Sequence, residues 1–369
     1  MKIGILTLPL HTNYGGILQA WALQTVLERM GYEVTFIEGF RIPPVGLLYN
    51  IRNILTCVLL KFRLYKLVKM MNLEAYAVAI NTNSFLSHYI HTKKYLPIAN
   101  IADGVFDVII VGGDQVLRPN YFGCQRMDSA FLTFTKGWNI KRIIYAASFG
   151  SDKWEYDTLM TEKCKKLIQY FDFVGIRETE GVEFCKSKLD YYNAELVLDP
   201  TMLLTTDFYN SACVNIVART GPIQYVLDTN EHTSSMLQKI NNLTGFTPRV
   251  INSKVENKKL PLKERIQPSV ESWIASFRDA DFVITDSYHA CVFSLLFNKP
   301  FIVIGNKERG LARFYTLLNT FGQEFRLVVN TEDINNLDMQ GLLTPPNVQP
   351  AISFMKEQSL SRLNSFLNK

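Results

Sequence analysis

Short apolar runs that each end in a polar or glycine-rich cluster recur along this chain, and they constrain its fold more than any other feature. The first run covers residues 3–8. It is followed by a loop at 11–16, a segment of helical spacing at 17–30 and a second run at 33–37. Continuous apolar strands joined through helices are typical of parallel sheets that are covered on both faces. Further runs of this kind occupy residues 106–111, 142–147, 171–176, 196–198, 223–227, 248–251, 281–285 and 300–304.

The recurrence predicts an α/β fold of two doubly wound, Rossmann-like domains that face a cleft. A chain of 369 residues is long enough for two domains. The Asp199-Pro200 turn precedes the predicted boundary, which lies between 205 and 222. We therefore expect one domain at 1–205 and a second at 206–369 that ends in a helix. Ligands of such folds bind beyond the carboxyl ends of the strands, where the polar clusters lie.

The positive charge of the chain is concentrated in one segment. The chain has 39 basic and 34 acidic residues and a formal net charge of +5. Six basic residues and no acidic residue lie between 41 and 72, and subtracting these six from +5 leaves −1 for the rest. This distribution excludes a general nucleic-acid-binding surface, so we expect no nucleic-acid partner.

The same segment, about 41–72, has the pattern of a basic amphipathic helix inserted in the first domain. Apolar residues recur in it at helical spacing, and two interpretations remain open. The helix docks on the anionic cytoplasmic face of the inner membrane, or its apolar stripe packs on the first domain and its basic residues are solvated. The apolar positions are 47, 48, 51, 54, 55, 58, 59 and 62.

The remaining composition predicts a cytoplasmic protein. The six cysteines are scattered along the chain, which is typical of reduced thiols in a cytoplasm. None of them forms a C-x-x-C pair, so a zinc ribbon is not expected. The N-terminus does not have the layout of a cleavable signal peptide. No apolar run reaches the length of about 18 residues that a transmembrane helix needs, so we expect membrane contact, if any, to be peripheral.

Two glycine-containing loops are candidate binding elements. Asn13, Gly15 and Gly16 lie between a strand and a helix, where a backbone can approach a ligand and the helix N-terminus favours an anion. The alternative is a plain tight turn. In the second loop, Gly112 and Gly113 precede Asp114, which is a candidate to orient or deprotonate a hydroxyl, or else a helix N-cap. Neither loop has G-x-G-x-x-G or a P-loop lysine, so nucleotide binding is not supported.

Arg177 and His289 are candidate anion-binding residues at strand ends. Arg177 can present its guanidinium to a carboxylate or phosphate, or it forms a structural salt bridge with Glu178 or Glu180. His289 falls in the first turn of a helix that Asp286 or Ser287 can cap. There it can donate a proton to a bound phosphate, unless it is a structural histidine.

These segments, in this order, resemble the polysaccharide pyruvyl transferase family. The resemblance spans about residues 1–320 and implies a fold like that of the two-domain GT-B glycosyltransferases. It also implies transfer of pyruvate from phosphoenolpyruvate onto two hydroxyls of a sugar as a cyclic ketal. The matching stretches are 2–7, 13–20, 111–116, Arg177-Glu178, 199–201, 285–290 and 298–301.

The resemblance also implies roles for particular residues. Arg177 and His289 match the residues that bind the donor, whereas Ser287 stands where some members have a second arginine. Arg309 or Arg313 is then expected to supply the missing charge. His289 is expected to be the general acid that serves the phosphate, and Asp114 the base for the hydroxyl or its positioner. The complete set of expected donor-binding residues is Asn13, Gly15, Gly16, Gly112, Gly113, Arg177, Ser287, Tyr288, Arg309 and Arg313.

The implied partners are phosphoenolpyruvate as donor substrate and a sugar or lipid-linked oligosaccharide as acceptor. We expect no cofactor. No cluster of His, Asp or Glu has metal-ligand spacing, so we expect no required metal. Two other functions fit the predicted architecture, namely a GT-B glycosyltransferase that uses a nucleotide sugar and a non-catalytic protein that binds glycans.

Overall fold

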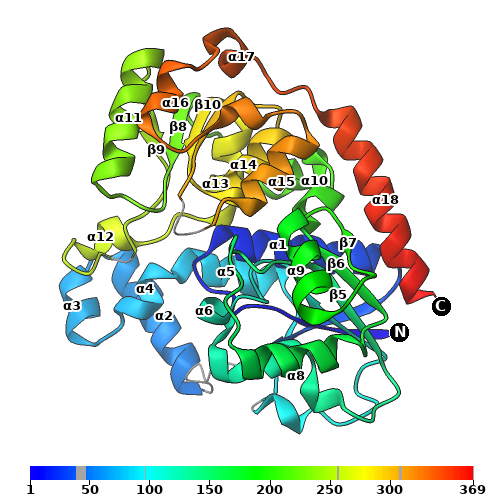
Figure 1. The fold of residues 1–369 in the computed structure, drawn as a ribbon. Coiled ribbons are helices and arrows are strands. Elements are labelled where there is room, and N and C mark those ends of the chain that lie inside the picture. The colour runs from blue at the N-terminus through cyan, green and yellow to red at the C-terminus, as the bar shows by residue number, and fades with distance from the viewer. Residues whose placement is uncertain (39–46, 96, 256, 307–309, 369) are drawn as a thin grey trace.

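Two parallel sheets form the framework of the protein in the computed structural model (Figure 1). The structure describes residues 1–38, 47–95, 97–255, 257–306 and 310–368, with only the backbone described for 47–50. The first sheet contains β1 (Lys2–Leu6), β2 (Glu33–Glu38), β3 (Thr92–Lys94), β4 (Val108–Gly112), β5 (Lys141–Ala147), β6 (Phe173–Ile176) and β7 (Glu195–Leu196). The second contains β8 (Gly221–Tyr225), β9 (Arg249–Val250), β10 (Ala280–Thr285), β11 (Phe301–Ile304) and β12 (Leu327–Val328).

Both sheets are doubly wound, as the sequence predicts. The order in the first sheet is β3-β2-β1-β4-β5-β6-β7, so the direction of winding reverses between β1 and β4. The order in the second is β12-β11-β10-β8-β9, with the reversal between β8 and β10. Such reversals open a crevice at the carboxyl ends of the two strands concerned, and ligands of this fold class bind there.

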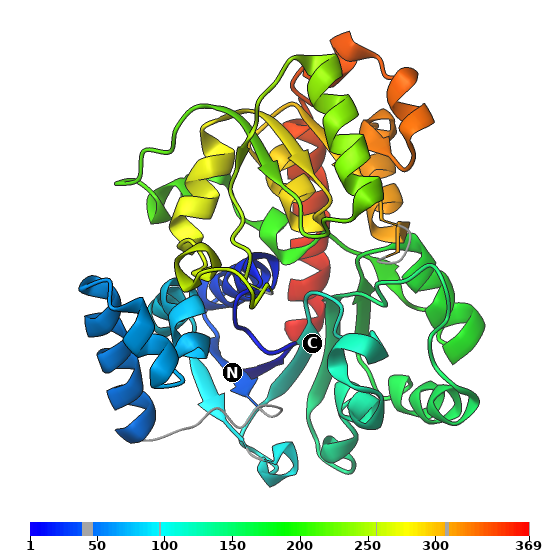
Figure 2. The ribbon, with the colours of Figure 1, turned by 90° about the vertical axis from the view of Figure 1, so that its left-hand side faces the viewer.

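Helices cover both sheets (Figures 1 and 2). The helix α1 (Tyr14–Arg29) connects β1 to β2 and is buried along most of its length because it lies between the two halves of the molecule. The helices of the first half are α2 (Leu47–Lys61), α3 (Tyr65–Met70), α4 (Glu74–Val78), α5 (Ile80–Tyr89), α6 (Pro119–Phe122), α7 (Met127–Ala130), α8 (Thr158–Ile168) and α9 (Thr179–Leu189). Those that follow are α10 (Thr206–Ala212), α11 (Glu231–Thr244), α12 (Leu262–Arg265), α13 (Val270–Arg278), α14 (Tyr288–Leu296), α15 (Ala312–Thr320), α16 (Thr331–Asn335), α17 (Met339–Leu343) and α18 (Gln349–Leu367).

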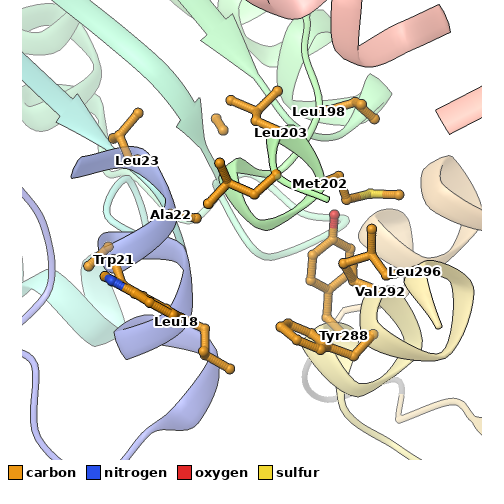
Figure 3. Packing of buried hydrophobic residues seen from close by; sticks show 14 of the residues in the cluster. Leu18, Trp21, Ala22, Leu23, Leu198, Met202, Leu203, Tyr288, Val292 and Leu296 are labelled. Atoms are coloured by element: carbon orange, nitrogen blue, oxygen red, sulfur yellow. The ribbon is translucent and has the colours of Figure 1, made fainter. Parts of the chain in front are cut away.

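One apolar cluster runs continuously from the first half into the second (Figure 3). Leu18 of α1, Met202 of the 3-10 helix η4 (Pro200–Leu203) and Val292 of α14 all belong to it and are fully buried. Burial of apolar surface stabilises at about 25 cal/mol per Å², so this shared core holds the halves together. Polar contacts add to it, because the Tyr14 hydroxyl donates to the carbonyl oxygen of Pro268 at 2.7 Å.

The C-terminal helix α18 returns to the first half of the molecule, although it follows the second sheet in the chain. The Leu198 N–H donates to the Ser359 hydroxyl at 3.2 Å, and the rings of Phe366 and Phe173 stack with their centroids 4.7 Å apart. The Lys141 ammonium donates to the carbonyl oxygen of Leu367 at 3.0 Å. The helix therefore connects the two halves, because it continues the chain of the second half and packs on the first.

The described helices include none with the length and mean hydropathy of a membrane span.

Candidate active site

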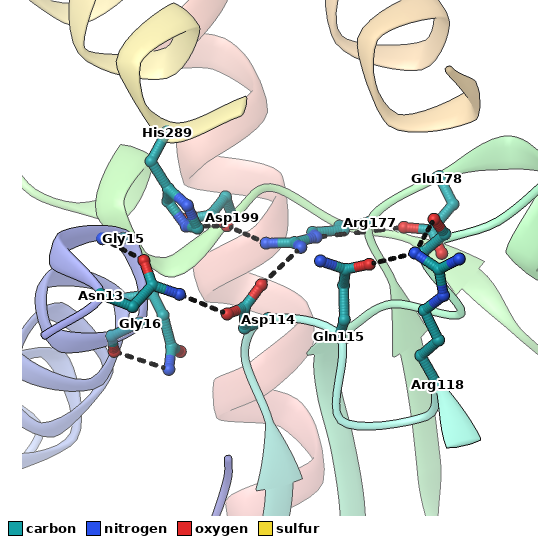
Figure 4. A network of polar contacts seen from close by, with 12 residues as sticks. Asn13, Gly15, Gly16, Asp114, Gln115, Arg118, Arg177, Glu178, Asp199 and His289 are labelled. Carbon is teal, nitrogen blue, oxygen red and sulfur yellow. Dashed lines mark hydrogen bonds and ion pairs between the residues drawn. The ribbon is translucent and has the colours of Figure 1, made fainter. Parts of the chain in front are cut away.

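The candidate site lies where the reversal points of the two sheets face each other (Figure 4). Asn13 follows β1 and Asp114 follows β4, the two strands that flank the reversal in the first sheet. His289 follows β10, which flanks the reversal in the second. Arg177 reaches the same point from the end of β6. The structure thus brings together four of the residues that the sequence singled out, from both halves of the chain.

Arg177 is the centre of a buried network of charges. Its Nη1 donates to Asp199 Oδ2 at 2.9 Å and its Nη2 donates to Asp114 Oδ1 at 3.1 Å. Its side chain is fully buried, and its Nε lies 4.0 Å from Glu178 Oε2. The ion pair with Glu178 that the structural interpretation named is thus present at 4.0 Å, but the shorter ion pairs of Arg177 go to Asp114 and Asp199. Glu180 has no contact with Arg177 among those described.

The network fixes the charges of its members. Burial would raise the pKa of Asp114, but Arg177, His289 and Arg313 together hold it below its ordinary value. Burial likewise opposes ionisation of Asp199, and His289 and Arg177 outweigh it, so the pKa of Asp199 is also lowered. The two carboxylates raise the pKa of Arg177 despite its burial. Both aspartates are accordingly ionised at neutral pH.

Asp114 does not cap a helix. The next described helix, α6, begins five residues later, and Asp114 adopts a left-handed backbone with φ of 50°. Its Oδ2 accepts from Asn13 Nδ2 at 3.4 Å, while Asn13 Oδ1 caps α1 by accepting from the Gly15 N–H at 3.1 Å. Asp114 therefore connects the N-terminal loop to Arg177.

His289 is the contribution of the second half to this network. It lies in the first turn of α14, is buried, and has its Nε2 3.5 Å from Asp199 Oδ2. The Nδ1 side of the imidazole lies against Gly15, and a Cβ added to this glycine would lie 2.0 Å from His289 Nδ1. Gly15 thus permits the close approach of the His289 imidazole in this structure, whereas the sequence predicted the approach of a ligand to both glycines.

Replacing Gly15 by alanine is expected to lower the free energy of unfolding by about 1–3 kcal/mol, the usual cost of overpacking. The methyl group would displace His289 and push the two halves apart. Gly16→Ala is the matched control, because a Cβ there meets its nearest atom at 3.5 Å, an ordinary contact. Urea denaturation of both variants tests the packing, and equal stability of the two would contradict it.

The helix that carries His289 begins differently from the prediction. Ser287 is its N-cap residue, but the Ser287 hydroxyl makes no capping hydrogen bond. Asp286 does not cap it either, since its carboxylate accepts from the backbone N–H groups of Leu227 and Asp228 at 2.7 and 2.9 Å. Asp286 instead ties the loop after β10 to the loop after β8.

Arg313, one of the two arginines expected to supply charge for the donor, lies near Arg177 at the same tyrosine ring. It is buried at the start of α15, and its Cζ lies 5.6 Å from the centre of the Tyr288 ring. The Arg177 Cζ lies 4.6 Å from the centre of that same ring. Burial and the neighbouring charge of Arg177 lower the pKa of Arg313. The other candidate, Arg309, lies outside the described residues.

The glycines of the second loop have packing partners within the protein. Gly113 has φ of +66°, and a Cβ on it would overlap the side chain of Gln19. A Cβ on Gly112 would lie 2.3 Å from the carbonyl oxygen of Tyr145. These glycines let the loop fit between α1 and β5, and this placement positions Asp114.

Two buried acids of the network, Asp199 and Glu178, were absent from the set of predicted site residues. Both lie in stretches that match the family, and Glu178 was considered only as a salt-bridge partner of Arg177. Besides Arg177 and His289, Asp199 binds Thr201, whose hydroxyl donates to Asp199 Oδ1 at 2.6 Å. Glu178 Oε1 accepts from the Phe149 N–H at 2.7 Å, and burial raises the pKa of Glu178 more than Arg177 and Arg313 lower it.

The raised pKa of Glu178 predicts a pH dependence of stability. Because the folded-state pKa lies above the unfolded one, folding is favoured at low pH and loses stability as pH rises through the folded pKa. Glu178→Gln keeps the acceptor for Phe149 without titrating. Its stability relative to the wild type should therefore increase in urea denaturation over the pH interval above the ordinary glutamate pKa of about 4.3. A relative loss over that interval would show that the arginines stabilise an ionised Glu178.

The charged side chains of the site are buried in this structure, and Asp114, Arg177, His289 and Arg313 are each at most 7% exposed. Behind Arg177, Asp199 and Tyr288, a cavity of about 20 Å³ is bordered by apolar side chains of α15 and α18, which is room for roughly one water molecule. The two halves are also joined directly, because Asp152 of the first half accepts from the N–H groups of Leu311 and Ala312 at the start of α15, at 3.0 and 2.8 Å. Within the described ranges, no group of three or more His, Cys, Asp or Glu side chains is arranged to hold a metal ion.

A comparison with known protein families shows to which of them this chain belongs. The family model for polysaccharide pyruvyl transferase matches residues 13–308. The chain belongs to the polysaccharide pyruvyl transferase family. The match includes Asn13, Asp114, Arg177, Asp199 and His289, so the buried network lies wholly within the family region. The family is one of transferases, so this chain is assigned to that class of enzyme. A search of curated proteins found no match.

Solved structures support the fold. The Methanocaldococcus jannaschii UDP-GlcNAc 2-epimerase aligns with 100% of this chain and 99% of its own, at 14% identity and a TM-score of 0.54. A glycosyltransferase from Rickettsia africae covers 99% of this chain and 98% of its own, at 10% identity and a TM-score of 0.52. The S. aureus MnaA–UDP co-structure covers 100% and 97%, at 12% identity and a TM-score of 0.51. The architecture is therefore GT-B-like, with the two sheets predicted from sequence.

Proposed function

We propose that this protein transfers the pyruvate unit of phosphoenolpyruvate onto two hydroxyls of a cell-surface sugar, forming a cyclic ketal and releasing phosphate. The observation that carries the proposal is the meeting of Arg177, Arg313 and His289 at the facing reversal points of the two sheets. Phosphoenolpyruvate carries a carboxylate and a phosphate, and both require cationic or N–H donors. The N-termini of α1 and α14 also point to this place and favour an anion.

The chemistry assigns two steps to the site. One sugar hydroxyl adds across the enol double bond, so that its oxygen bonds to the central carbon and its proton goes to the methylene carbon, which becomes a methyl group. The second hydroxyl then displaces phosphate from the same carbon, and the proton that His289 gives to the phosphate is replaced by the proton of this hydroxyl. His289 is the proposed proton donor to the departing phosphate, since it lies in the first turn of α14 where the phosphate would bind.

Asp114 is proposed as a positioning residue. A carboxylate with a lowered pKa is a weak base, and Asp114 is already bound to Arg177 and Asn13. Its contribution is to hold Arg177 at the carboxyl ends of the strands. Asp199 holds Arg177 from the other side and holds His289 as well. The first half thereby orients both groups that face the donor.

Donor binding is proposed to require a rearrangement of the site, because its charged groups are buried against one another in this structure. Arg177 already uses Nη1 and Nη2 on carboxylates. We propose that the halves separate to admit the donor, with α14 and α15 withdrawing His289 and Arg313 from the first half. Closure would then exclude water from the reacting carbon.

Two alternatives are distinguishable by binding. A glycosyltransferase of this architecture would bind a nucleotide sugar, and a glycan-binding protein would bind neither small donor. Phosphoenolpyruvate at about 100 times its Kd should stabilise the protein by about 2.7 kcal/mol in thermal unfolding. UDP-GlcNAc and inorganic phosphate at the same concentration serve as controls. Stabilisation by UDP-GlcNAc and not by phosphoenolpyruvate would overturn the proposal.

A further inference from the structure

The helix α2 has two apolar faces, and the described residues of the protein cover only one of them. Leu59 of this helix is buried in a small cluster with Val68, Leu73 and Leu262. Part of the predicted apolar stripe therefore packs on the protein itself. The residues on the other face, Ile51, Ile54, Val58 and Phe62, recur at intervals of three and four and are exposed to solvent. Two of them are exposed by 64% (Ile54) and 66% (Phe62).

The exposed apolar surface continues onto α3. Met70 is 78% exposed, and Leu64, Leu67 and Met71 are exposed as well. The connection is tight, because the Leu64 N–H donates to the carbonyl oxygen of Leu59 at 2.8 Å. Figures 1 and 2 place α2 and α3 at the edge of the molecule. We call this set the α2–α3 surface, and its apolar members are Ile51, Ile54, Val58, Phe62, Leu64, Leu67, Met70 and Met71.

Basic side chains accompany these apolar ones without an acidic counterpart. Every charged residue from 47 to 73 is basic, and all are exposed, namely Arg52, Lys61, Arg63, Lys66 and Lys69. The nearest acidic residue on the C-terminal side, Glu74, forms an ion pair with Arg265 at 3.0 Å. The α2–α3 surface is therefore cationic, whereas the rest of the protein has little net charge.

We propose that the α2–α3 surface docks on an anionic lipid bilayer. Exposed aliphatic and aromatic side chains between lysines and arginines match the interface of such a membrane, which takes up both kinds of group. A nucleic acid would leave the apolar residues unused. A second copy of this chain would bring two cationic surfaces together, so charge complementarity favours an anionic partner. The inference is independent of the reaction proposed for the site.

Co-sedimentation of the full chain with vesicles tests the proposal. Vesicles of phosphatidylcholine alone are compared with vesicles of phosphatidylcholine and phosphatidylglycerol in equal parts. The protein should bind only the second kind, and binding should weaken with added salt. Changing Lys61, Arg63, Lys66 and Lys69 to Gln should lower the partition coefficient by about fivefold for each residue. Ile54→Ser with Phe62→Ser should lower it further.

Matched controls come from the opposite edge of the first sheet. Exposed lysines there can be changed to Gln in equal number, at Lys153, Lys166, Lys186 and Lys188. Leu159→Ser removes a side chain that is 81% exposed. These variants should bind vesicles as the wild type does.

Three outcomes would overturn the proposal. Equal recovery in the supernatant with both vesicle types would show that the surface does not bind lipid. A loss of binding in the control variants equal to that in the α2–α3 variants would show that only net charge matters. Self-association in sedimentation velocity that Ile54→Ser and Phe62→Ser abolish, without vesicle binding, would show that a second copy covers the surface.

Discussion

Replacing His289 by glutamine is expected to lower turnover by roughly 10²–10⁴-fold, the usual contribution of a positioned proton donor. Glutamine is close to histidine in size and places an amide near Asp199, so the contact between the halves should persist. The loss should therefore appear in kcat, while the urea midpoint changes little. Phosphate release from phosphoenolpyruvate in the presence of acceptor is the measurement.

His232→Gln is the control, because this histidine also belongs to the second half but is exposed. Its turnover should equal that of the wild type. If His289→Gln unfolds the protein, the histidine serves the contact with Gly15 and Asp199. If His289→Gln is folded and fully active, the proton-donor role is wrong.

Arg177→Ala is expected to lower the free energy of unfolding by about 3–5 kcal/mol, as is typical when one partner of a buried ion pair is removed. Asp114 and Asp199 would remain buried and ionised without their shared guanidinium. The structure thus changes the expectation for this residue. Sequence alone predicts weaker donor binding in a folded variant, whereas the ion pairs predict loss of stability before any loss of affinity.

The exposed pair of Arg362 and Glu195 provides the contrast. Arg362→Ala removes an equal charge from solvent and should leave the urea midpoint nearly unchanged. Arg177→Lys tests the geometry, because lysine keeps the charge but cannot bind both carboxylates as the planar guanidinium does. A folded Arg177→Ala variant with wild-type stability would show that the two aspartates do not depend on this arginine.

Much of the fold follows from local sequence. The run at 142–147 corresponds to β5 (Lys141–Ala147), and the run at 281–285 corresponds to β10 (Ala280–Thr285). These strands are covered on both faces, so their apolar residues are continuous and easy to recognise. The strand β3 escaped the prediction because its residues, Thr92 to Lys94, are polar and exposed at the sheet edge.

The candidate site could be located but not resolved from sequence. Strand ends indicate where Asp114, Arg177 and His289 lie, because parallel strands share one carboxyl edge. Which carboxylate pairs with which cationic side chain depends on how the two halves pack together, and no local sequence pattern specifies this packing. Asp199 bridges Arg177 and His289 across this junction. Gly15 similarly has its partner 274 positions away in the chain, at His289.

The most direct test of the account is mass spectrometry of a glycan acceptor after incubation with the protein and isotopically labelled phosphoenolpyruvate. A panel of cell-surface oligosaccharides serves as acceptor, with His289→Gln as the inactive control. One acceptor should gain the mass of labelled pyruvic acid less one water, with one phosphate released for each unit transferred. Transfer of a sugar from UDP-GlcNAc to the acceptor, with phosphoenolpyruvate unconsumed, would contradict it.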